Sequence, residues 1–156
     1  MSRPRFLFVT GTLREGSPSP AWPDRSSALR GLTAEDGSWV SWRLAGANNR
    51  ELGRSAQVYP DLLRCVEDAV AVIAGIARTQ ALLALNHVTG LWVWRLDLDE
   101  RPVAVAARGH QRRRECEYSL SRFLAAVPDA AAPDVHAHPR TSRRGRVGVL
   151  GGTGAA

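Results

Sequence analysis

The chain has 156 residues, of which 44% are hydrophobic and 23% charged, and these proportions are typical of a protein that folds around one core. All 21 basic residues are arginine, so chemistry that needs a lysine, such as a Schiff base or a P-loop, is excluded. The formal net charge is +6, and residues 101–156, with ten arginines against four acidic residues, carry all of it.

The chain has no apolar run near the ~20 residues that a membrane helix requires. Its first residues do not follow the pattern of a secretory signal, and two cysteines are too few for a disulfide framework. We therefore expect a cytoplasmic protein with no membrane partner.

The first 37 residues are predicted to form a strand followed by an irregular arm. Phe6–Val9 is a short apolar run that indicates the strand. Glycine, proline and serine recur through residues 11–36, so this stretch is predicted to be mostly loop, with room for a short helix over Arg25–Leu32.

A predicted hairpin follows. Val40, Trp42 and Leu44 alternate along the chain, which indicates a half-buried strand. Asn48-Asn49-Arg50 is then typical of a turn, and a second strand is predicted over Glu51–Gln57.

A helix is predicted next, with Pro60 in its first turn. Residues 80–88 fit either an additional strand or a continuation of the helix, because their periodicity does not separate the two. The buried stripe of the helix is expected to contain five apolar residues at helical spacing: Cys65, Ala69, Val72, Ile73 and Ile76.

The same order of elements recurs about 52 positions later. Trp42-Arg43-Leu44 returns as Trp94-Arg95-Leu96, a turn is predicted over Asp97–Glu100, and a strand over Pro102–Arg108. Pro128 is expected to stop the second helix. The second helical stripe, now 51 positions after the first, is Cys116, Leu120, Phe123, Leu124 and Val127.

One ββα unit cannot bury its own sheet face and helix stripe, but two units can do so together. We therefore predict an α+β fold over residues 38–128: an antiparallel sheet from two ββα repeats, about 38–78 and 90–128, with two helices on one face and a pseudo-twofold axis. Residues 129–156 are expected to form a basic, disordered tail.

The repeated pattern resembles the YegP-like small ββα repeat, a family of uncharacterised function that is often found in tandem. The resemblance covers about residues 38–127 and implies a fold, with no catalytic residues to carry over. It departs from the family at Glu100-Arg101 and at His110. It rests on Trp42-Arg43-Leu44-Ala45-Gly46-Ala47-Asn48-Asn49, on Leu52-Gly53-Arg54-Ser55 and on Tyr59.

A second resemblance covers nine residues only. Phe6-Leu7-Phe8-Val9-Thr10-Gly11-Thr12-Leu13-Arg14 is similar to the opening of gamma-glutamylcyclotransferase-like proteins, with Thr10 in place of a tyrosine. The resemblance implies a loop whose backbone amides hold a substrate carboxylate.

Most of the tryptophans lie in the two leading strands. The favoured interpretation places Trp42 and Trp94 in the core of the sheet. The alternative is a stacking platform for bases or sugars, and it requires exposed rings beside arginines. Alternation places Arg43 and Arg95 on the face opposite to these two rings.

The basic residues before and within the first turn of the second helix are the best candidate binding site. Cations there oppose the helix dipole. The alternative is that these arginines form only a solvated run of charge in an arginine-rich sequence. Such a cluster can bind phosphate or carboxylate. The candidate residues are Arg108, Arg112, Arg113 and Arg114, with Arg43 and Arg95 on the sheet.

Neither a catalytic centre nor a metal or cofactor site is predicted. Cys65 and Cys116 occupy equivalent helical positions and are expected to be buried thiols. His136 and His138 lack further ligands at a suitable spacing, and structural roles are favoured for His87 and His110.

Three hypotheses follow for function. The first is a non-catalytic tandem-repeat module that acts in binding or interaction. The second is binding of nucleic acid or another anion by Arg108–Arg114 and the basic tail. The third is a gamma-glutamylcyclotransferase-like enzyme. The sequence allows a nucleic acid, an acidic protein or a second copy of the chain as partner.

Overall fold

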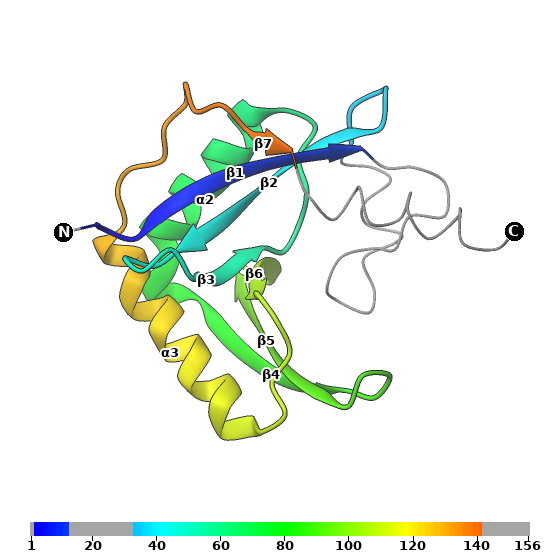
Figure 1. Cartoon of the computed structure of the whole chain (residues 1–156), viewed down its shortest axis with the longest axis vertical. Coiled ribbons are helices and arrows are strands. Elements are labelled where there is room, and N and C mark those ends of the chain that lie inside the picture. The colour runs from blue at the N-terminus through cyan, green and yellow to red at the C-terminus, as the bar shows by residue number, and fades with distance from the viewer. Residues whose placement is uncertain (1, 13–32, 142–156) are drawn as a thin grey trace, which may run out of the picture.

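The computed structural model describes residues 2–12 and 33–141 (Figure 1). The helix expected over Arg25–Leu32, and most of the loop expected over residues 11–36, lie outside these ranges. Within them the protein is α+β, with a seven-stranded, mostly antiparallel sheet and two α-helices.

The first half of the chain contributes three strands and one helix. The expected hairpin forms β2 (Ser38–Ala45) and β3 (Glu51–Ser55), and the strand predicted near the N-terminus is β1 (Arg5–Thr12). α2 (Leu62–Gly75) follows, with a short 3-10 turn η2 (Ile76–Arg78) at its end.

The second half has the same order of elements. β4 (Gln80–Asn86) precedes the hairpin of β5 (Leu91–Leu98) and β6 (Arg101–Ala106), and α3 (Arg113–Asp129) follows it. The segment 80–88, which the sequence left open between strand and helix, therefore contains a strand. A last strand, β7, comprises only Arg140–Thr141.

The strand order of the sheet is β4-β5-β6-β3-β2-β1-β7. Every neighbouring pair is antiparallel except β1 and β7, which run parallel. β1 pairs along its whole length with β2, so the sheet extends beyond the predicted repeat region. The predicted tail contributes β7, and residues 142–156 lie outside the described part.

Two prolines occupy places that differ from the predicted ones. Pro60 does not lie in the first turn of α2, because Asp61 is the N-cap and accepts a hydrogen bond from the backbone N–H of Arg64 at 2.8 Å. Pro128 does not end α3 immediately, because the helix runs one residue further to Asp129. A proline has no N–H to donate to the carbonyl oxygen four residues earlier, and its ring crowds that carbonyl, so it disfavours a helix interior and is found here one residue before the end of α3.

The β5–β6 turn is tighter than predicted. Asp97 belongs to β5, and only Asp99 and Glu100 connect the strands, with φ angles of 51° and 64°. A two-residue turn with both φ values positive matches the right-handed twist of the strands. The β2–β3 turn places one non-glycine residue, Asn49, at a φ of 63°.

One hydrophobic core joins the two halves. The side chains of Trp42 and Trp94 are fully buried, which confirms the core interpretation and contradicts a stacking platform built on these two rings. Phe123 of α3 contacts both: its ring centroid lies 6.3 Å from that of Trp42 and 5.0 Å from that of Trp94. The face that carries both tryptophans is therefore covered by helix.

Gly53 shows how closely this helix approaches the sheet. A Cβ atom at this position would lie 2.6 Å from the ring of Phe123 and 2.9 Å from that of Trp94. Glycine is therefore required at the centre of the sheet by packing rather than by its backbone angles. Cys65 and Cys116 are buried free thiols in the same core, as predicted.

Neither α2 nor α3 combines the length and the apolar character that crossing a membrane would need, and this holds for the described residues.

Candidate functional site

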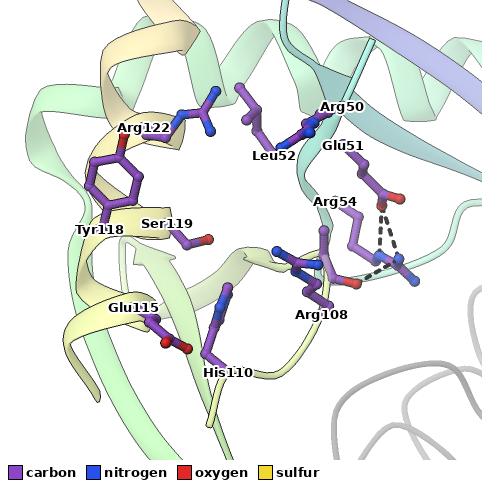
Figure 2. Close-up of a pocket in the computed structure, with 11 residues that line it drawn as sticks. Arg50, Glu51, Leu52, Arg54, Arg108, His110, Glu115, Tyr118, Ser119 and Arg122 are labelled. Carbon is purple, nitrogen blue, oxygen red and sulfur yellow. Dashed lines mark hydrogen bonds and ion pairs between the residues drawn. The ribbon is translucent and has the colours of Figure 1, made fainter. Parts of the chain in front are cut away.

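A pocket of about 760 Å³ opens where β3 and β6 separate from each other. The two strands pair only through residues 53–55 and 104–106. Beyond the end of this short ladder at Gly53 and Ala106, residues 50–52 and 107–110 contribute to two walls of the pocket. The third wall is α3. The lining residues are Arg50, Glu51, Leu52 and Arg54 from the first wall, Ala107, Arg108 and His110 from the second, and Glu115, Tyr118, Ser119 and Arg122 from α3 (Figure 2).

Three of the lining arginines come from different elements. Arg50 precedes β3, Arg108 follows β6, and Arg122 lies on α3. Within residues 2–12 and 33–141, no ion pair involves any of the three. Arg122 lies 5.9 Å from the ring centroid of Tyr118, which supports its guanidinium from one side. These arginines can therefore approach a ligand without first leaving a carboxylate.

The fourth arginine has a structural part in the pocket. Arg54 is 7% exposed and donates hydrogen bonds to Glu51 Oε1 at 3.0 Å and to the carbonyl oxygen of Ala107 at 2.9 Å. Since Glu51 lies on β3 and Ala107 follows β6, the guanidinium ties two walls of the pocket together. The Oε1 atom of Glu51 also lies 3.7 Å from Nε of Arg43, which forms an ion pair with Glu51 but does not line the pocket.

His110 forms the base of the pocket. Its backbone N–H and C=O form hydrogen bonds with the backbone of Trp92, at 2.8 and 2.6 Å, which fixes the residue beside β5. The Nε2 atom is buried and has no hydrogen-bond partner in the described part of the chain. Burial and the nearby Arg108 lower the pKa of His110, while Glu115 opposes this change. His110 is therefore held neutral, with an unused polar atom.

The α3 wall is organised by helical spacing. Glu115, Tyr118, Ser119 and Arg122 follow one another at intervals of three, one and three residues, so they share one face of the helix. Ser119 accepts a hydrogen bond from Nε1 of Trp94 at 3.1 Å, which fixes the hydroxyl at the boundary between the core and the pocket.

Only one of the six predicted site residues lines the pocket, and it is Arg108. Arg95 lies on the sheet and donates two hydrogen bonds to the carboxylate of Asp97, at 2.8 and 3.0 Å. Arg113 pairs with Glu117 at 3.1 Å and lies 5.5 Å from the ring centroid of Trp92.

Arg112 and Arg114 are exposed at the start of α3 and do not line the pocket. Arg112 is the N-cap of α3 without a side-chain capping bond. The structure therefore divides the predicted cluster, and only its first member faces the pocket.

Sequence reasoning missed Arg50 and Arg122. Arg122 could have been found from its spacing, because it stands seven residues after Glu115 and three after Ser119 on a polar face. Arg50 had no comparable signal, since its place depends on the pairing of β3 with β6, which joins residues about fifty positions apart.

The described residues contain no group of three or more His, Cys, Asp and Glu that could hold a metal ion. His136 and His138, which are partly or fully exposed, belong to no such group. Burial raises the pKa of the Cys116 thiol to about 11, and it raises the pKa of the Cys65 thiol further. Both thiols are thus held in their unreactive form.

Most of the segment that resembles gamma-glutamylcyclotransferases forms a strand here. Residues 5–12 form β1, and Gly11 lies against the ring of Trp39. Leu13 and Arg14 are outside the described residues, and the pocket beside α3 has no lining residue from β1.

No family model matches the chain, and no curated protein matches it. A solved structure to which the chain is similar is the solution NMR structure of YegP from E. coli, a protein of unknown function. The two are 9% identical, the similarity covers 91% of this chain and 95% of the other, and the TM-score is 0.46.

Proposed function

We propose that this chain is a non-catalytic binding module that holds an anionic group in the pocket between β3, β6 and α3. The observation that carries the proposal is the convergence of Arg50, Arg108 and Arg122, from three separate elements, on one concavity. Arginine presents a planar fork of donors that fits carboxylate or phosphate, and such pairs gain strength where water is partly excluded.

The neutral groups of the pocket favour the same ligand class. Ser119 brings a hydroxyl, and Nε2 of His110 is a buried polar atom without a partner in the described chain. An imidazole that donates a proton to a bound anion gains the partner that it lacks. The volume of about 760 Å³ falls within the range typical of small-molecule sites.

The scaffold for this site is proposed to be a duplicated βββα unit, β1-β2-β3-α2 and β4-β5-β6-α3. Two regularities support this. The repeat offset of 51 residues relates Gly53 to Ala104 and Ser55 to Ala106. In the central ladder Gly53 pairs with Ala106 and Ser55 pairs with Ala104, so the pairing of β3 with β6 is symmetric in register. The bridge Val40↔Tyr59 likewise has a counterpart in Trp92↔His110.

A titration with tripolyphosphate and with citrate, followed by calorimetry, tests the proposed ligand class. We expect binding to wild-type protein and a loss of roughly tenfold in affinity in Arg108→Gln and in Arg122→Gln, which corresponds to about 1.4 kcal/mol each. Arg114→Gln is the matched control, because it removes the same charge from the same helix outside the pocket.

Equal losses in all three variants would mean that net charge alone attracts the anions, and would contradict the proposal. A random oligonucleotide, titrated at about 50 and about 200 mM salt, is the second arm. If the oligonucleotide affinity falls steeply with salt and is unchanged in Arg122→Gln, the binding site is an extended nucleic-acid surface rather than the pocket.

A further inference from the structure

β4 is one edge of the sheet. The strand (Gln80–Asn86) pairs with β5 on one side, and on its other side the described residues offer no strand partner (Figure 1). Half of its backbone N–H and C=O groups therefore point away from the sheet, where they can pair with another extended segment.

The edge lacks the features that usually prevent such pairing. β4 contains no charged residue and no proline over its seven residues, whereas β7 at the other edge has only two residues, one of them an arginine. Leu82 is 46% exposed and Leu85 38%, and Val88 in the following turn is 92% exposed. An uncharged apolar edge strand of this length is a typical surface for β-sheet extension.

We propose that the partner is a second copy of this chain, and that two β4 strands pair antiparallel about a twofold axis through Leu83. A twofold interface requires a surface that fits itself. With the axis at Leu83, Leu82 faces Ala84 and Ala81 faces Leu85, so a large side chain meets a small one at each flanking pair. The terminal pair joins the amides of Gln80 and Asn86.

The register with β5 places these contacts relative to the core. Leu83 lies opposite Trp94, so Ala81, Leu83 and Leu85 share the helix-covered face of the sheet. The central Leu83–Leu83 contact would therefore extend the hydrophobic core of each copy into the next. Leu82 and Ala84 lie on the other face, beside Arg95 and Val93.

Sedimentation velocity of the full chain, from about 5 to about 500 µM, tests the proposal, because a single strand pair gives a dimer that dissociates on dilution. We expect a dimer whose dissociation constant rises at least tenfold in Leu82→Glu. Leu63→Glu is the matched control, since Leu63 on α2 is 59% exposed and lies away from β4.

Mixing Leu82→Glu with Ala84→Lys tests the register. Residue 82 of one copy faces residue 84 of the other, so the introduced carboxylate and ammonium attract each other only in the mixed dimer. Restored association in the mixture supports an axis at Leu83, and failure to restore it overturns this register.

Hydrogen exchange on wild-type protein keeps the proposal testable without any variant. The backbone amides of residues 80–86 should become more protected as the concentration rises. A protein that stays monomeric over the whole range, or a dimer that forms equally well in Leu82→Glu, would overturn the proposal.

Discussion

The two helices meet the sheet through different chemistry at corresponding places. On the α2 side, Asp68 is buried and accepts a hydrogen bond of 2.7 Å from Nε1 of Trp42 and another from the hydroxyl of Tyr59. On the α3 side, Trp94 donates to Ser119, and His110 stands where the other side has Tyr59.

We call the α2 side closed, because the polar groups around Asp68 bind one another, and the α3 side open, because Ser119 and His110 line the pocket. Burial raises the pKa of Asp68, and the hydrogen bonds from Trp42 and Tyr59, with the charge of Arg101, oppose this change. The carboxylate of Asp68 thus accepts its hydrogen bonds from groups of the protein itself. On the α3 side the acceptor of the indole N–H is the Ser119 hydroxyl rather than a carboxylate. In the proposed duplicated unit, Arg122 of α3 matches Ala71 of α2, 51 positions earlier. In the proposed duplicated unit, a few residue differences at matched positions separate a stabilising hydrogen-bond network from a cationic pocket.

The largest expected effect concerns the closed side. Asp68→Ala removes the acceptor of the buried Trp42 indole and of the half-buried Tyr59 hydroxyl, whereas Ser119→Ala removes the acceptor of the Trp94 indole alone. Since an unsatisfied buried donor costs about 1–3 kcal/mol, we expect Asp68→Ala to lower the free energy of unfolding by about 2–4 kcal/mol and Ser119→Ala by about half as much. Urea unfolding monitored by circular dichroism measures both.

Asp68→Asn serves as the control for that comparison, because the amide keeps an acceptor at the same place. Equal losses in Asp68→Ala and Ser119→Ala would contradict this expectation and show that the α2 and α3 sides are stabilised alike.

A smaller effect distinguishes the two hairpins. Glu100 has a φ of 64° in the two-residue turn between β5 and β6, and a non-glycine residue pays a steric penalty there. Glu100→Gly is expected to stabilise the protein by about 0.5–1 kcal/mol, because relief of this penalty exceeds the added freedom of the unfolded chain. The control is Asn49→Gly in the other hairpin, where asparagine tolerates a positive φ and the gain should be smaller. Thermal unfolding compares them.

The smallest effect is on the open side and depends on pH. The pKa of His110 is lowered in the folded state, so the unfolded chain binds the proton more readily. Stability should therefore decrease as the pH falls below about 6.5, and His110→Gln should weaken this decrease. Arg108 and Glu115 are the charged groups that act on the pKa of the imidazole, and the other charged residues that line the same pocket are Arg50, Glu51, Arg54 and Arg122.

The test is the midpoint of thermal unfolding at pH values between about 5.5 and 7.5 in both proteins. Identical pH profiles would mean that His110 does not contribute. With saturating tripolyphosphate, the midpoint of thermal unfolding of the wild-type protein should instead rise as the pH falls, because a bound anion favours the protonated imidazole.

The elements with strong periodicity were predictable from sequence. The alternation around Trp42 and Trp94 located both hairpins, and the helical stripes located α2 and α3. β4 was not decided by sequence, because Ala81–Leu85 is almost continuously apolar and its pairing with β5 is a tertiary property. The turn between β5 and β6 was predicted over Asp97–Glu100, but its two-residue length was not, since neither Asp99 nor Glu100 is the glycine or asparagine that marks such a turn.

The pocket was less predictable than the fold. A run of arginines drew attention to residues 112–114, but these three are exposed at the start of α3 and none of them lines the pocket. The residues that do converge are far apart in the chain and become neighbours only through the short β3–β6 ladder.

Phe123 belongs to the second half of the chain yet touches the central tryptophan of each hairpin. Neither half should therefore fold on its own. Without the second half, Trp42 would lose its contact with Phe123, and without the first half, Phe123 would lose its contact with Trp42. Melting should accordingly proceed in a single step for the entire sheet, and damage at either end should be felt at the opposite end.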